Sequence, residues 1–214
     1  IADLTADTGV KHSVWRMDNE AIIAKISKEI NSMETLYIAD GHHRSAAASR
    51  VAAARRDPAQ NTNENSAEFF LAVAFSAKQM RILDYNRVAR DLNGLSAEEL
   101  IEKLQKVGVL TQKSAPVAPK KVGVCGVYLN KTWYELAFHE ALFPPNDPVK
   151  SLDVSVLSDH VLEPILGIAD LRRDTRIDFV GGIRGLKELE KRVDSGQMAL
   201  AFSMFATPMQ ALMN

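Results

Sequence analysis

Short apolar runs alternate along this chain with segments whose apolar residues recur at helical spacing. Residues 177–180 and 198–205 are strand-like runs, whereas residues 151–167 and 186–194 place leucine, isoleucine and valine along one side of a helix. No apolar run reaches the roughly 18 to 20 residues that a membrane-spanning helix requires. Helices and strands mixed in this order predict an α/β fold, of the α+β kind with a mixed sheet, and argue against an all-α or all-β chain.

The 214 residues are enough for two small domains. Residues 113–121 contain two prolines and mark the predicted boundary between a first domain over residues 1–112 and a second over residues 122–214. The chain begins with Ile1 and ends just after an apolar segment. We therefore expect a fragment of a longer chain, with a truncated second domain.

Local signals predict the elements of the first domain. Residues 1–19 are expected to form a hairpin, and Asn19 is expected to cap the helix that follows it. Apolar runs at residues 36–39, 69–75 and 81–88 are expected to be strands. The first of these strands would lead into an alanine-rich helix that ends near residue 56.

Further signals lie in the remainder of the chain. Ser96 and Glu99 have the spacing of a helix capping box, and residues 130–131 are the predicted turn of a second hairpin. Asp153 precedes an apolar helix stripe and is interpreted as its N-cap. Cys125 lies in an apolar run and is interpreted as a buried strand residue rather than a reactive thiol.

The charge balance bears on the choice of partner. Twenty-six Lys and Arg against twenty-seven Asp and Glu give a net charge of −1, and this balance argues against nucleic acid as a partner because such binding needs surplus positive charge. With a single cysteine, no intrachain disulfide can form, which fits a cytoplasmic location. A homo-oligomer is compatible with the sequence, and no membrane association is expected.

Residues 40–45, Asp-Gly-His-His-Arg-Ser, are the predicted functional centre. Gly41 permits a positive φ and a close backbone approach, and the helix that follows aims free amide hydrogens at one point. Arg44 adds a planar guanidinium suited to phosphate oxygens, and Ser45 continues the loop into the helix. Strand, glycine turn and helix start in this order predict an anion site, most simply for a nucleotide phosphate.

The other side chains of the loop can supply chemistry. His42 and His43 can donate hydrogen bonds or transfer protons. Asp40 can hold Mg²⁺, orient a histidine or act as a general base. Two alternatives remain: a structural Asp-Gly turn, and a metal site on the two histidines, which would need further ligands.

These residues carry a resemblance to a known family. The Asp-Gly-His-His-Arg segment followed by an alanine-rich helix resembles the signature of DUF1015, a bacterial and archaeal family of unknown function. Residues 9–15, 85–88, 152–157 and 176–182 also resemble that family, so the likeness covers essentially the whole chain. The resemblance implies that members extend beyond both ends, and it implies no activity.

The loop is also similar to one in the ParB/sulfiredoxin fold, including ADP-dependent free-serine kinases. This likeness covers about the first ninety residues. It implies a ParB/sulfiredoxin-like first domain that binds ATP or ADP through Gly41 to Ser45, with Asp40 and a histidine near the transferred group. By itself, this likeness does not identify the substrate.

Two residues outside the loop are candidates for substrate contacts. Arg87 lies at the end of a predicted strand and could bind a carboxylate or phosphate bidentately. His12 lies on the strand before the first helix and could face the site. Each has an ordinary structural alternative, as a surface arginine and as a strand histidine.

The leading hypothesis is a nucleotide-dependent small-molecule kinase. It would transfer a phosphoryl group from ATP or ADP, with Mg²⁺, to a small polar acceptor such as an amino acid. Gly41, His42, His43, Arg44 and Ser45 would bind the nucleotide, and Asp40 would act on the acceptor or hold the metal. The alternatives are a non-catalytic, nucleotide-gated binding module of the ParB kind and a metal-dependent hydrolase.

Overall fold

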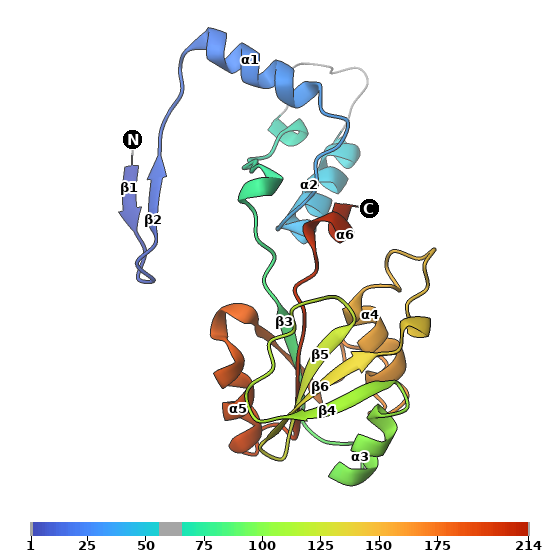
Figure 1. Ribbon diagram of the computed structural model, residues 1–214. Helices are drawn as coiled ribbons and strands as arrows, with labels where there is room; N and C mark the ends of the chain where they lie inside the picture. The colour runs from blue at the N-terminus through green and yellow to red at the C-terminus, as the bar shows by residue number, and fades with distance from the viewer. Residues whose placement is uncertain (1, 56–65, 214) are drawn as a thin grey trace. The chain divides into compact units, whose positions relative to one another are not determined.

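The computed structural model describes residues 2–55 and 66–213, which divide into two compact units, Ile1–Val73 and Ala74–Asn214 (Figure 1). The sequence suggested a boundary at residues 113–121 instead. The difference arises because β3 (Tyr85–Ala89) pairs with strands near the C-terminus, so residues from about 85 onward belong to the second unit.

The first unit begins with the predicted hairpin. Strands β1 (Ala2–Thr5) and β2 (Lys11–Val14) are antiparallel and form a two-stranded sheet. Gly9 adopts a φ of 80° in the connecting turn and donates its amide hydrogen to the carbonyl of Ala6. The hairpin prediction is confirmed, and none of the described residues in its strands is buried.

Two helices follow. The side chain of Asn19 accepts a hydrogen bond from the amide of Ile22 and caps α1 (Glu20–Asn31), as predicted. Helix α2 (His42–Arg55) is the expected alanine-rich helix, and a short 3₁₀ turn lies at Ser66–Glu68. None of the residues described in the first unit is buried, although α1 carries a stripe of four isoleucines.

The strands predicted at residues 36–39 and 69–75 are wrong. Neither segment forms sheet hydrogen bonds in the structure, and no strand of either sheet includes them. Leu36 is 62% exposed and Phe69 is 71% exposed. An apolar run becomes a strand only when a partner strand accepts its backbone hydrogen bonds, and the described part of this unit offers none to these two runs.

The second unit is built on an antiparallel sheet. Its described strands have the order β4-β6-β5-β8-β3-β7 and each neighbouring pair is antiparallel. The bounds are Tyr85–Ala89 for β3, Gly108–Lys113 for β4, Val124–Leu129 for β5, Thr132–Phe138 for β6, Ile177–Gly181 for β7 and Leu200–Ser203 for β8. The strand predicted over residues 81–88 therefore begins later than expected, at Tyr85.

The β5–β6 hairpin turns as the sequence predicts. Asn130 and Lys131 have φ values of 47° and 60°. Two consecutive positive φ values are typical of the type I′ turn, whose twist matches that of the flanking strands. The antiparallel register, with Leu129 opposite Thr132, follows from this two-residue connection.

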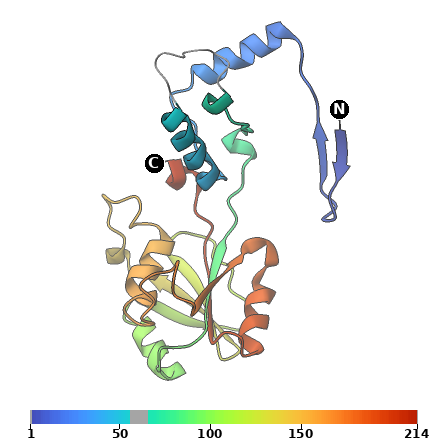
Figure 2. The same cartoon turned by 180° about the vertical axis from the view of Figure 1, so that it is seen from behind.

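Helices cover both faces of this sheet, as the two views show (Figures 1 and 2). Their bounds are Ala97–Leu104 for α3, Asp153–Leu157 for α4, which continues as a π-helical turn over Ser158–Leu162, and Leu186–Asp194 for α5. Helix α6 (Met209–Met213) follows β8 and lies away from the sheet in both views. The capping box of Ser96 and Glu99 is present at the start of α3. Shorter 3₁₀ turns lie at Ala77–Gln79, Glu140–Leu142 and Gly182–Arg184.

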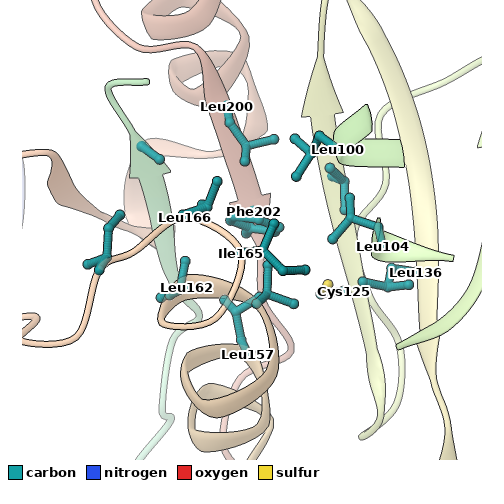
Figure 3. Close-up of a cluster of buried hydrophobic side chains, with 14 of the residues drawn as sticks. Leu100, Leu104, Cys125, Leu136, Leu157, Leu162, Ile165, Leu166, Leu200 and Phe202 are labelled. Atoms are coloured by element: carbon teal, nitrogen blue, oxygen red, sulfur yellow. The ribbon is translucent and has the colours of Figure 1, made fainter. Parts of the chain in front are cut away.

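Successive residues of a strand point to opposite faces of the sheet, and their contacts assign α3, α4 and α5 to faces. On β8, Leu200 and Phe202 join the cluster that also contains residues of α3 and α4, whereas Ala201 joins the cluster with Leu189 of α5. Figure 3 shows the first cluster, in which Leu100, Leu136 and Phe202 come from different elements. Cys125 is fully buried there, as predicted. The content of helices and antiparallel sheet makes this an α+β protein.

Among the described residues, no helix is both long enough and apolar enough to cross a membrane.

Candidate functional site

The backbone of residues 40–45 has the predicted left-handed step. Gly41 adopts a φ of 79°, a region that disfavours residues with a Cβ atom. A Cβ atom at this position would lie 3.2 Å from a terminal nitrogen of Arg44. The missing side chain therefore lets the guanidinium fold back over the turn, so that a cation covers the start of α2.

The first turn of α2 presents free amides. The amide of Ser45 donates to the carbonyl of Gly41 at 2.9 Å and closes the first helical hydrogen bond. Within the described residues, no acceptor is paired with the amide hydrogens of His42, His43 and Arg44, and the first turn contains no acidic residue. Unpaired amides and the positive end of the helix dipole attract an anion.

Asp40 and Arg44 form an ion pair across this turn. A terminal guanidinium nitrogen of Arg44 lies 3.3 Å from a carboxylate oxygen of Asp40. The side chain of Arg44 is 83% exposed and that of Asp40 is 93% exposed, so water screens the attraction and the pair contributes little to stability. Arg44 is therefore held in place by a partner that a better anion can replace.

The two histidines of the loop remain accessible. His42 and His43 are both exposed in the first turn of α2, not packed in an interior. Among the described residues, no group of three or more His, Cys, Asp or Glu side chains has a spacing that could hold a metal ion. The prediction that Asp40 holds Mg²⁺ stays a prediction.

One part of the predicted setting is wrong. Residues 36–39 form no strand, so the loop is not a strand-to-helix connection and no sheet fixes its first half. The described structure anchors the loop through Gly41, the ion pair and α2 alone. Its geometry is thus local to a few residues.

His12 is not joined to the loop by any interaction among the described residues. It lies on β2 opposite Leu4 and is exposed. The structure brings together Asp40, Gly41 and Arg44, and leaves His12 on the hairpin. Its role as a substrate contact stays a prediction.

Arg87 belongs to β3 in the second unit and is only 7% exposed, so its interpretation as a surface arginine is wrong. Its guanidinium carbon lies 5.5 Å and 5.3 Å from the ring centres of Tyr85 and Phe179, which stack on each other. Its Nε is buried without a partner among the described residues, while Nη1 donates to the carbonyl of Tyr85. Burial lowers the pKa of Arg87 to about 10.

A pocket of about 640 Å³ in the second unit, with Asp153 in its lining, was not predicted from the sequence. Asp153 is the first residue of α4 rather than its N-cap, which is Leu152, so the capping prediction is wrong. Its carboxylate instead accepts the amide hydrogen of Gly123 at 2.9 Å. This partner lies 30 positions away in the sequence, beyond the reach of any local signal.

Comparison with known proteins places a family model over residues 1–155, and that model describes a protein of unknown function (DUF1015). The match includes both the loop at residues 40–45 and Arg87. No curated protein and no solved structure matches the chain.

Proposed function

Because this chain belongs to the DUF1015 family of proteins of unknown function, its activity has to be inferred from its own residues. We propose that residues 40–45 bind the phosphates of a nucleotide, ATP or ADP, and that the protein transfers a phosphoryl group to a small polar acceptor such as an amino acid. The single observation that carries this proposal is the left-handed Gly41, which sets a guanidinium beside amides at the start of α2 that have no acceptor among the described residues.

Phosphate binding is the step that these contacts support best. Amide hydrogens of His42, His43 and Arg44 would donate to phosphate oxygens, and Arg44 would add a charged, planar donor. Asp40 now shares that donor at 3.3 Å. A phosphate carries more charge than a carboxylate, so it would compete well for Arg44 and release Asp40.

A released Asp40 is the group that can act on the acceptor. Its carboxylate would take the proton of an acceptor hydroxyl as the phosphoryl group is transferred. His42 or His43 would donate hydrogen bonds to the charge that develops on the transferred group. Mg²⁺ commonly binds through one or two carboxylates together with substrate phosphates, so the alternative role of Asp40 is to hold Mg²⁺ instead of acting as the base.

The choice of an amino acid as acceptor comes from the loop's similarity to that of ADP-dependent free-serine kinases. A nucleotide-gated binding module would use the same phosphate contacts without the transfer. The two differ in one measurable property, which is the appearance of a phosphorylated acceptor.

Calorimetric titration with ADP and ATP, with and without Mg²⁺, tests the binding step. Arg44→Ala should weaken nucleotide binding by about tenfold or more, since a hydrogen bond to a charged group is worth roughly 1.5–3 kcal/mol. Arg50→Ala is the matched control, because Arg50 is an exposed arginine on the same helix. Equal affinities in the two variants would contradict the assigned role of Arg44.

Asp40→Asn separates chemistry from binding. We expect this variant to bind nucleotide and to lose phosphoryl transfer, measured by phosphorus NMR with serine and related hydroxyl compounds as acceptors. Undiminished transfer by Asp40→Asn would remove the general base, and nucleotide binding without transfer to any acceptor in the wild type would favour the binding module.

A further inference from the structure

A second candidate site lies wholly within the second unit. The pocket of about 640 Å³ is bounded by the start of β5, the end of β6, the start of α4 and α6. Its volume falls in the range of pockets that bind small molecules in proteins. None of the residues at 40–45 lines it, so it is independent of the proposed phosphate loop.

The walls of the pocket are largely apolar. Phe138 and Phe143 lie edge to face, with ring centres 6.3 Å apart, and Leu152, Phe205 and Pro208 extend the apolar surface. An apolar wall of this kind binds the hydrocarbon or aromatic body of a ligand but does not orient it. Orientation requires a polar group of defined position.

Asp153 is that group. It is 7% exposed, and among the described residues no lysine, arginine or histidine forms an ion pair with it. Within the part of the chain that the structure describes, its carboxylate accepts a hydrogen bond only from the amide of Gly123. Burial raises the pKa of Asp153, and the Gly123 amide opposes that shift only in part. A buried carboxylate with one neutral donor has unused capacity for a charged donor.

The charges at the edge of the pocket do not supply this donor. Lys121 and Glu140 both contribute to the lining, are exposed and carry opposite charges. Lys121 makes no ion pair with Asp153 among the described residues. The cation that would match Asp153 therefore has to come with a ligand.

We propose that this pocket binds a small molecule with a protonated primary amine on an apolar body, with the ammonium on Asp153 and the body against Phe138 and Phe143. The ammonium would donate to the carboxylate while Gly123 keeps its hydrogen bond. The proposal goes beyond the phosphate loop in both location and ligand chemistry, and it does not depend on nucleotide binding.

The rival explanation is purely structural. Gly123 has a φ of 82°, and Asp153 could serve only to hold that turn. The variant Asp153→Asn distinguishes the two explanations. An asparagine oxygen can still accept the Gly123 amide hydrogen, whereas the negative charge is lost. A structural role survives this substitution, and recognition of a cation does not.

Phenethylamine and phenethyl alcohol are matched probes, since they share an aromatic body and differ in charge. In the wild type, we expect calorimetry or NMR titration to show that the amine binds at least about tenfold more tightly than the alcohol, in line with a charge-assisted hydrogen bond. In Asp153→Asn, the preference should shrink to within about threefold, which is less than one such bond provides. Asp159→Asn, at an exposed acid in the next helical turn, should keep the wild-type preference.

Three results would overturn the proposal: equal binding of amine and alcohol by the wild type, an unchanged preference in Asp153→Asn, or no saturable binding of the amine. If Asp153→Asn does not fold, the amide resonance of Gly123 in the wild type decides. This resonance should shift more with phenethylamine than with phenethyl alcohol at the same concentration. A Gly123 amide resonance that does not shift when the amine is added would contradict the proposal.

Discussion

The two units of this protein differ in what holds them together. The second unit has a packed core in which Phe202, Leu136 and Leu100 are fully buried, whereas no residue described in the first unit is buried. The two tryptophans illustrate the contrast, with Trp133 of the second unit 4% exposed and Trp15 of the first 79% exposed. Stability therefore resides in the second unit, while the proposed phosphate loop lies in the first.

This contrast means that the proposed phosphate loop would have to form without a packed core around it. The loop at residues 40–45 depends on one glycine conformation, one exposed ion pair and one helix start. These are short-range features that can form without a surrounding core. Pre-organisation of the amides should nevertheless be weaker than in a loop fixed by a sheet, so affinity is expected to depend strongly on Arg44.

The largest expected effect comes from removing a core side chain. Phe202→Ala should lower the free energy of unfolding by about 3–5 kcal/mol, because a large buried ring is lost from the cluster in Figure 3. Phe69→Ala, at an exposed phenylalanine of the first unit, should change it by less than about 0.5 kcal/mol. Denaturant titration followed by tryptophan fluorescence measures both, and similar losses in the two variants would contradict this difference between the units.

A glycine in the sheet should give the next largest effect. Gly126 leaves room for the buried hydrogen bond that the Ser203 hydroxyl donates to the Val117 carbonyl at 2.6 Å, and a Cβ atom would collide with both groups. Gly126→Ala should destabilise the second unit by about 1–3 kcal/mol, the usual cost of overpacking. Gly181→Ala is the control, since nothing lies within 4 Å of its added Cβ. Thermal unfolding of Gly126→Ala and Gly181→Ala measures this difference in stability.

The corresponding substitution in the first unit should act differently. Gly41→Ala places a Cβ at a φ of 79° beside Arg44, at a local cost of about 1 kcal/mol. We expect the unfolding midpoint of the second unit to stay unchanged, while ADP affinity falls in calorimetric titration. A lowered midpoint with intact affinity would reverse the division of roles between the units.

The smallest effect is electrostatic. It distinguishes the ion pairs of Arg192 with Asp178 and Glu188 from the exposed pair of Arg44 with Asp40. Hydrogen bonds lower the pKa of Asp178, mainly from the Phe179 amide and also from Arg192, and those from Arg192 lower the pKa of Glu188. Because these folded pKa values lie below the unfolded ones, their stabilisation is present above about pH 4–5 and is lost as the pH falls through the folded pKa values. Arg192→Gln should flatten the acid limb of stability against pH, measured by denaturation at each pH, whereas Arg44→Ala should not.

The features that could be predicted from sequence are those whose partners are neighbours in the chain. Asn19 caps α1 through Ile22, Ser96 and Glu99 cap α3, and residues 130–131 form the expected turn. In each case both partners lie within a few residues, so composition and spacing specify the contact. The left-handed step at Gly41 belongs to the same class.

The features that escaped prediction depend on distant partners. Residues 36–39 and 69–75 have strand-like composition, but pairing depends on a second strand that their own sequence does not encode. Asp153 looks like a helix cap, yet its partner is Gly123. Arg87 looks like an exposed strand-end arginine, and its burial becomes visible only when β3 and β7 bring Tyr85 and Phe179 together. Long-range pairing, rather than local propensity, decided all of these.

The most direct test of the phosphate loop is an amide NMR titration of the intact chain with ADP. We expect saturable shifts that are largest at the amides of His42, His43 and Arg44 and that disappear in Arg44→Ala, while the strands of the second unit stay unperturbed. Shifts centred on other residues, or unchanged resonances at residues 41–45 in millimolar ADP, would contradict phosphate binding by this loop.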